Sequence, residues 1–266
     1  MTEFATSKDG TRLAYDKLGQ GPPLVIVNGA LSVRTFTFAR KMAEDLGRVF
    51  TVYNYDRRGR GDSTDTAPYG VAKEVEDVAA ICKAAGGKPF VVGLSSGAAL
   101  ALEAAASGVP MAGLYAYEPP YINAGPGAKA DPEYRTKMER LVADGDRAGA
   151  VTYFMRFVGV PGIGVAIMKV LPMWKVMLGV AHTLPYDARI MDGFDVPAGR
   201  FRKIAVPTVV GAGEKTTPGL KAGAKAAADA VPRAQHRIVP KSNHGIKPKA
   251  MTAELSAVFL AASLPK

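Results

Sequence analysis

The chain alternates short apolar runs with longer segments of helical periodicity, and this alternation constrains the fold more than any other feature. The apolar runs are rich in Val, Ile and Tyr and lie at 24–27, 49–53, 90–92, 113–117, 207–210 and 236–239. Segments with apolar residues at three- and four-residue spacing lie between them, at about 34–46, 72–86, 96–107, 218–231 and 248–263. This order predicts an α/β fold with a mostly parallel central sheet flanked by helices. We therefore expect the functional groups at the carboxyl ends of the strands.

Residues 125–202 interrupt the alternation. They contain no convincing strand pattern, but an amphipathic stretch over 131–157 and an apolar stretch over 163–180 that is rich in methionine and aromatic residues. We expect a core domain formed by residues 1–124 and 203–266, with a helical cap over 125–202.

Composition and cysteine content indicate a globular protein of a reducing compartment. The 266 residues are 48% hydrophobic and 22% charged. The single cysteine, Cys82, has no partner for a disulfide and falls among apolar residues of a predicted helix, where an inert thiol is expected. The amino terminus lacks the pattern of a secretory signal, and Pro161, Lys169 and Pro172 interrupt the most apolar segment. We expect a cytoplasmic protein without a membrane partner.

The net charge of +10 is concentrated in residues 200–266, which contain twelve Lys or Arg residues and only three acidic residues. Such a balance is compatible with an anionic partner. The favoured interpretation is a solvated basic face, because no nucleic-acid-binding motif accompanies the charge. We expect no nucleic-acid partner.

A Gly-x-Ser-x-Gly pentapeptide at 93–97 is the most informative local motif. A buried-type strand precedes it and an alanine-rich helix follows, which is the context of a nucleophile elbow. Such a turn strains the middle residue, Ser95, and presents its hydroxyl, while the amide of Ser96 points toward an oxyanion.

A serine nucleophile needs a base, and His244 is the favoured candidate among three histidines. It follows the last predicted strand, whereas His236 lies within that strand and His182 lies in the insertion. The base in turn needs a carboxylate that fixes its tautomer.

Two glutamates at strand ends compete for the acid. Glu118 directly follows the strand at 113–117 and precedes two prolines, and Glu214 follows the next strand. We favour Glu118 over Glu214, because Glu214 lies in a loop beside a lysine and threonines. Asp192 and Asp195 are the remaining candidates.

With these residues the chain resembles the α/β-hydrolase fold family from about Asp9 to Phe259. The order Ser95, acid, His244 is that of the family, and the segment 55–63 is similar to its structural Asp-x-Arg-Gly-x-Gly-x-Ser motif. The turn at 28–30 stands where the family has a His-Gly turn, so the resemblance implies that the amide of Ala30 joins that of Ser96 in an oxyanion hole. The family commonly has an aspartate in the loop that here holds Glu214; some members place a glutamate after the preceding strand, which favours Glu118.

Serine at the elbow indicates acyl transfer rather than displacement at a saturated carbon. We predict a serine hydrolase that cleaves a small to medium hydrophobic ester or lactone and requires no metal or cofactor. Residues that we expect to line its pocket are Tyr121, Phe154, Phe157, Met168, Trp174 and Met177, with Met155 and Met173 as further candidates. A ligand receptor with little turnover, a carbon–carbon bond hydrolase, a perhydrolase and an acyltransferase stay open as alternatives. The sequence leaves monomer and homodimer equally open.

Overall fold

One sheet of eight strands forms the centre of the molecule, in the order β1-β2-β4-β3-β5-β6-β7-β8. The computed structural model describes residues 2–125 and 129–260. The six predicted strands are present as β3 (Pro23–Val27), β4 (Thr51–Tyr55), β5 (Phe90–Leu94), β6 (Gly113–Tyr117), β7 (Thr208–Gly213) and β8 (Gln235–Val239). Their pairings with one another are all parallel. The predicted α/β fold with a mostly parallel sheet is confirmed.

Two further strands, β1 (Thr2–Thr6) and β2 (Arg12–Leu18), extend the sheet as an antiparallel hairpin. Neither strand was predicted from the sequence. The sequence of β1, Thr-Glu-Phe-Ala-Thr, contains no apolar run that would predict a strand, and most of its residues are exposed. Its backbone pairing with β2 holds it in the sheet.

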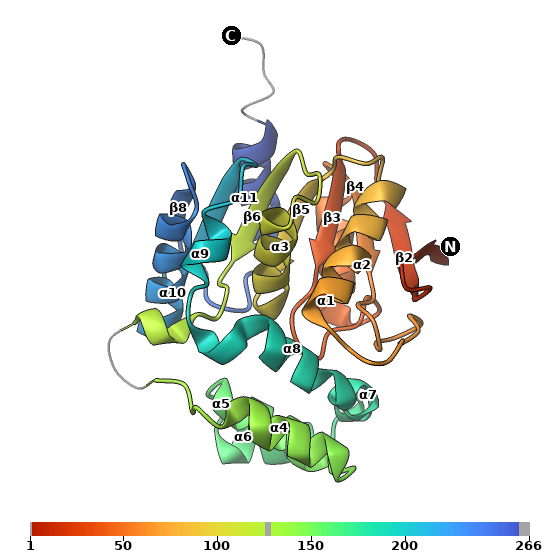
Figure 1. Ribbon diagram of the computed structural model, residues 1–266, viewed down its shortest axis with the longest axis vertical. Coiled ribbons are helices and arrows are strands. Elements are labelled where there is room, and N and C mark those ends of the chain that lie inside the picture. The colour runs from red at the N-terminus through yellow and green to blue at the C-terminus, as the bar shows by residue number, and fades with distance from the viewer. Residues whose placement is uncertain (1, 126–128, 261–266) are drawn as a thin grey trace.

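Helices cover both faces of the sheet (Figure 1). Helices α1 (Thr37–Leu46) and α11 (Pro248–Leu255) contribute to one buried apolar cluster. Helices α2 (Val71–Ala84), α3 (Ser96–Ala106) and α10 (Pro218–Ala230) contribute to the other. A π-helical turn at Ser256–Leu260 continues α11, and the last three residues of the helix predicted over 248–263 lie outside the described residues.

Between β6 and β7 the described part of the chain is helical and contains no strand. The segments are η1 (Ile122–Ala124), α4 (Tyr134–Ala143), α5 (Arg147–Phe157), α6 (Gly162–Met168), α7 (Pro172–Val180), η2 (Ala181–Thr183), α8 (Leu184–Met191), η3 (Asp192–Phe194) and α9 (Ala198–Phe201). Helices α4 to α7 gather at one end of the sheet, and α8 lies between them and the core (Figure 1). Helix α8 contacts both α3 of the core and α4 of the insertion, so it joins the two parts.

The apolar character of this segment serves packing. The rings of Tyr134, Phe157 and Phe194 form a cluster with centroid separations of 4.3 to 5.2 Å. Among the described helices, none is by itself long and apolar enough to cross a bilayer; only the pair Gly162–Met168 and Pro172–Phe194, bent by 97°, meets that measure when joined.

Candidate active site

Ser95 occupies a strained turn between β5 and α3. Its φ is 55° and its ψ is −124°, a conformation that side-chain-bearing residues rarely adopt. The flanking glycines make the turn possible: a Cβ on Gly97 would lie 2.1 Å from the Val27 carbonyl oxygen, and one on Gly93 would lie 2.6 Å from Ala98 Cα. The local geometry is that of a nucleophile elbow.

The turn after β3 lies directly against this elbow. A Cβ on Gly29 would lie 3.0 Å from the Leu94 carbonyl oxygen and 3.1 Å from Ser95 Cβ, so any larger residue there would crowd the elbow. Asn28 anchors the turn, because its side-chain amide donates to Asn54 Oδ1 at 2.9 Å. Ala30 follows in the same turn and lines the cavity that contains Ser95.

His244 and Glu118 form a close pair. His244 Nδ1 lies 2.6 Å from Glu118 Oε2. The Glu118 carboxylate is fully buried, whereas the His244 side chain is 45% exposed and lines both cavities at Ser95. Glu118 also accepts hydrogen bonds from the Gly213 amide at 2.7 Å and from Thr216 Oγ1 at 3.0 Å. These donors fix the carboxylate in one orientation toward the histidine ring.

Backbone contacts between strand ends bring this pair to the elbow. The Ser95 amide donates to the Tyr117 carbonyl at 2.9 Å, and the Glu118 amide donates to the Gly211 carbonyl at 2.9 Å. Tyr117 Oη donates to the Asn243 carbonyl at 2.7 Å, one residue before His244. Burial raises the pKa of the Tyr117 hydroxyl, and the negative charge of Glu118 raises it further, so this hydroxyl keeps its proton.

The competing acids lie elsewhere. Glu214 is exposed, and its carboxylate accepts from the Lys241 amide at 2.7 Å, which closes the loop after β8. Asp192 and Asp195 are exposed at the end of the insertion.

The other two histidines also lie away from the Glu118 pair. His182 Nε2 is 4.0 Å from Asp65 Oδ2, and burial lowers the pKa of its imidazole. His236 lies within β8, and burial lowers its pKa as well.

Two cavities meet at Ser95 and His244. The first has a volume of about 310 Å³ and adjoins the turn at 28–30; its apolar lining comes from Phe38, Leu94, Tyr117, Phe154, Met155, Val158 and Ile246. The second has a volume of about 430 Å³ and a more polar wall; its lining includes Pro120, Ile122, Phe157, Val158, Leu220, Lys215, Thr216, Thr217 and Asn243. Both volumes fall in the range of small-molecule sites.

The predicted lining residues divide into two groups. Phe154 and Phe157 line these cavities. Tyr121, Trp174 and Met177 line neither, because their side chains are buried in the main apolar cluster, and Met168 packs against that cluster. Four further lining residues were not predicted from the sequence: Phe38, Val158, Ile246 and Lys215. Phe38 lies within the helix predicted over 34–46 and Val158 directly follows the amphipathic stretch over 131–157, and nothing in the sequence distinguishes either from other apolar residues.

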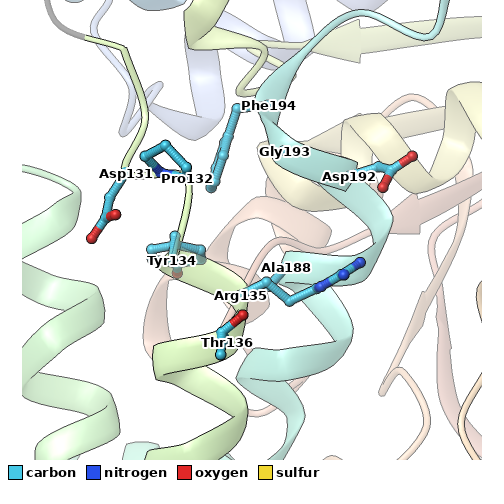
Figure 2. A pocket seen from close by; sticks show the side chains of 9 residues that line it. All are labelled: Asp131, Pro132, Tyr134, Arg135, Thr136, Ala188, Asp192, Gly193 and Phe194. Carbon is cyan, nitrogen blue, oxygen red and sulfur yellow. The ribbon is translucent and has the colours of Figure 1, made fainter.

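A separate hollow of about 180 Å³ lies between α4 and the end of α8. Figure 2 shows its lining, with Asp131, Arg135 and Asp192 around the aromatic rings of Tyr134 and Phe194. It contains neither Ser95 nor His244 and has no nucleophile and base side by side. Within residues 2–125 and 129–260, no group of three or more His, Cys, Asp or Glu side chains is arranged to hold a metal ion.

Comparison with known proteins agrees with the fold. The model of the alpha/beta hydrolase family matches residues 24–254. The chain therefore belongs to the α/β hydrolase family.

The crystal structure of an alpha/beta hydrolase from Sphaerobacter thermophilus DSM 20745 is similar over 97% of this chain and 100% of that one, with 46% identity and a TM-score of 0.87. An enol-lactonase from Burkholderia xenovorans LB400 is similar in fold, at a TM-score of 0.71 and 18% identity, over 98% of this chain and 100% of that one. The N-formylmaleamate deformylase of Pseudomonas putida KT2440 is 36% identical over 132 residues, a match that spans 47% of this chain and 47% of that protein.

Proposed function

We propose that the protein is a serine hydrolase that cleaves a carboxylic ester or lactone through an acyl-enzyme on Ser95. His244 acts as general base and Glu118 as the acid that orients it. The amides of Ala30 and Ser96 form the oxyanion hole. The substrate is a small to medium molecule with an apolar part.

The observation that carries the proposal is the 2.6 Å contact between the buried Glu118 carboxylate and His244, which lines the same cavities as a serine held at a φ of 55°. A fully buried carboxylate is costly unless its partners compensate it. Here three groups bond to it, the Gly213 amide, Thr216 Oγ1 and His244 Nδ1, and of these only the histidine lines both cavities at Ser95. That arrangement serves a base that must take and return a proton.

The mechanism follows from these positions. Ser95 Oγ attacks the substrate carbonyl carbon while His244 Nε2 accepts the hydroxyl proton, and Glu118 stabilises the imidazolium. The carbonyl oxygen becomes an oxyanion between the two amides. When the tetrahedral intermediate collapses, the leaving alcohol takes the proton from His244 and the acyl group stays on Ser95. Water, deprotonated by His244, then attacks the acyl-enzyme; the bond between the acyl carbon and Ser95 Oγ breaks, His244 returns the proton to Oγ, and the acid is released.

The two cavities suggest how a substrate lies. The apolar cavity that adjoins Ala30 suits a hydrocarbon part, and the second cavity offers Lys215, Thr216 and Thr217 to a polar or anionic part. A mono-p-nitrophenyl ester of a dicarboxylic acid tests this arrangement against a neutral ester of equal length. Lys215→Met should raise KM about tenfold for the anionic ester only, and Lys221→Met, outside both cavities, should change neither.

Amide hydrolysis is the second candidate. It is favoured by the similarity to the N-formylmaleamate deformylase, a relative that is 36% identical over the matched segment. The same nucleophile, base and oxyanion hole serve an amide, provided that His244 protonates the leaving nitrogen. Parallel assays of p-nitrophenyl esters and p-nitroanilides separate the two candidates by their ratio of kcat/KM.

The test of the proposal is hydrolysis of p-nitrophenyl esters of increasing chain length by the wild type and by Ser95→Ala. We expect turnover that the substitution abolishes, with an optimum chain length that reflects the apolar cavity. A folded wild type that is inert on all esters, lactones and anilides would contradict the proposal and favour a ligand receptor.

A further inference from the structure

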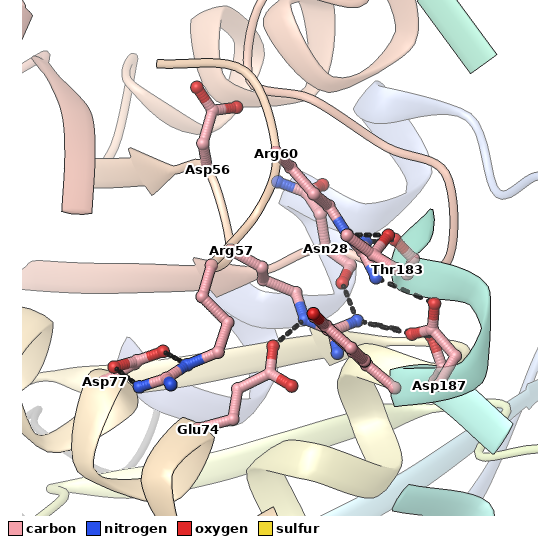
Figure 3. Close-up of polar contacts among 12 residues, drawn as sticks. Asn28, Asp56, Arg57, Arg60, Glu74, Asp77, Thr183 and Asp187 are labelled. Carbon is pink, nitrogen blue, oxygen red and sulfur yellow. Dashed lines mark hydrogen bonds and ion pairs between the residues drawn. The ribbon is translucent and has the colours of Figure 1, made fainter. Parts of the chain in front are cut away.

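A buried cluster of four charged side chains links the insertion to the core (Figure 3). It consists of Arg57 and Arg60 from the loop after β4, Glu74 from α2 and Asp187 from α8, and each is at most 1% exposed. Arg57 Nε donates to Glu74 at 2.6 Å, and Arg57 Nη1 donates to Asp187 Oδ1 at 2.7 Å. Arg60 Nη2 donates to Asp187 Oδ2 at 2.7 Å. Each carboxylate oxygen of Asp187 thus accepts a hydrogen bond from a different arginine.

Asp187 also contacts the residue that follows the nucleophile. Ser96 Oγ donates to Asp187 Oδ1 at 2.8 Å. Burial opposes ionisation of Asp187, yet Arg60 and Arg57 hold the pKa of its carboxyl below the usual value, so it is charged at neutral pH. A side chain of the insertion therefore holds the first residue of α3.

Arg60 connects the cluster to the turn after β3. Arg60 Nη1 donates to the carbonyl oxygen of Gly29 at 2.7 Å. That carbonyl belongs to the same peptide group as the N–H of Ala30. Because a trans peptide is planar, its C=O and N–H point in opposite directions, so a bond that holds the oxygen also aims the N–H. A hydrogen bond to the carbonyl also polarises the peptide and strengthens its N–H as a donor.

The insertion positions Arg60 for this contact. Its guanidinium is held by Asp187 Oδ2 at 2.7 Å and by Thr183 Oγ1 at 3.1 Å, both of them residues of the insertion. Arg57 Nη1 adds a longer contact of 3.4 Å to the Asn28 carbonyl. The cluster therefore fixes the turn at 28–30 and the start of α3, the two segments that supply the proposed oxyanion hole.

A buried arginine can be paired with a carboxylate without any contact to the turn at 28–30, as the neighbouring pair of Arg58 and Asp77 demonstrates. Arg58 from the same loop is also fully buried, and its Nε and Nη2 donate to Asp77 at 2.6 and 2.7 Å. Its remaining partners are Asp9 and the Lys73 carbonyl, and none of them belongs to the turn at 28–30. Asp77 is thus a matched control: a buried carboxylate on an adjacent arginine, without the link to the site.

We propose that Asp187 and Arg60 are positioning residues for the reaction, which hold the Gly29–Ala30 peptide so that the Ala30 amide faces the developing oxyanion. The inference rests on the proposed serine hydrolase function. It assigns to the insertion a part in the chemical step, beyond lining the cavity.

The test compares Asp187→Asn with Asp77→Asn in the full-length protein, with p-nitrophenyl ester kinetics, melting temperature and inhibition by an alkyl boronic acid. The boronic acid forms a tetrahedral adduct with the serine and reports the oxyanion hole. For Asp187→Asn we expect kcat to fall 10- to 100-fold with KM within threefold, since loss of a whole oxyanion donor costs about 100- to 1,000-fold. The inhibition constant should rise by a similar factor. Asp77→Asn should lower the melting temperature comparably and leave kcat within twofold.

A gentler variant keeps the inference testable if Asp187→Asn does not fold. Thr183→Val removes the Thr183–Arg60 contact and leaves every charge in place, so kcat should fall about threefold at unchanged KM. Equal kcat losses in the Asp187 and Asp77 variants, or an unchanged kcat in Thr183→Val, would overturn the inference. A wild type without any turnover would instead overturn the proposed function itself.

Discussion

Replacing Glu118 by Gln tests the acid of the site, with Glu214→Gln as the control. The substitution keeps the shape of the side chain and an acceptor for the Gly213 amide, but it removes the charge 2.6 Å from His244 Nδ1. Two unit charges centred about 4 Å apart interact by about 4 kcal/mol at an effective dielectric constant of about 20. Loss of that stabilisation from the imidazolium of the transition state corresponds to about 10³ in rate. The disturbed tautomer of the histidine adds to the loss, so we expect kcat to fall by about 10³ to 10⁴.

The assay is kcat for a p-nitrophenyl ester, normalised by titration of active sites, with circular dichroism as a check of folding. Glu214→Gln should stay within twofold of the wild type, because that carboxylate is exposed and accepts its hydrogen bond from a loop amide, that of Lys241. A folded Glu118→Gln variant within tenfold of the wild type would refute the reasoning. Equal losses in both variants would refute it as well.

Four further predictions follow from the geometry. Gly97→Ala should lower the free energy of unfolding by about 3 kcal/mol in urea titrations, because its Cβ would lie 2.1 Å from the Val27 carbonyl oxygen. The control Gly199→Ala, whose Cβ would have nothing within 4 Å, should be neutral or stabilising. Equal effects of the two substitutions would contradict the close packing of the elbow. Ser95→Gly should be more stable than Ser95→Ala by about 1 kcal/mol, because glycine relieves the strain at a φ of 55°, and the reverse order in thermal melts would argue against strain. Native Cys82 should not react with Ellman's reagent and should react fully in guanidinium chloride, because it is 1% exposed and burial raises its thiol pKa to about 12; rapid native labelling would be inconsistent with this core. The pKa of Asp187 is lowered from its ordinary value of 3.8, so as the pH falls through that value the unfolded state takes up its proton before the native state does. The stability advantage of the wild type over Asp187→Asn should therefore shrink as the pH falls from 5 to 3. An equal difference in free energy of unfolding at both pH values, measured by urea titration, would contradict this.

The parts of the site that local sequence determines could be predicted. Ser95 is fixed by a strand, a glycine-flanked turn and a helix that are contiguous in the chain, and His244 follows the last strand. Glu118 and Glu214 both follow neighbouring strands, so pattern alone left both open. The choice depends on how the backbone turns at Glu118, whose φ is 49°, and on hydrogen bonds from a loop about a hundred residues further on.

The insertion was harder to interpret, because an apolar side chain carries no information about which cavity it faces. Trp174 and Met177 resembled pocket residues but lie in the main apolar cluster, while Phe38 from α1 lines the cavity beside Ser95. Asp187 had no local signal at all: its partners Arg57 and Ser96 lie 130 and 91 positions away in the chain. Such contacts arise only when the helix that carries the aspartate packs on the core.

The central claim is an acyl-enzyme on Ser95, and covalent labelling tests it most directly. The protein would be treated with a fluorophosphonate probe and analysed by intact-mass measurement and peptide mapping. We predict a single adduct on Ser95, absent in Ser95→Ala and strongly slowed in His244→Ala, because the serine needs its base to attack phosphorus. Ester turnover with no adduct on Ser95, or with an adduct on another residue, would contradict the account.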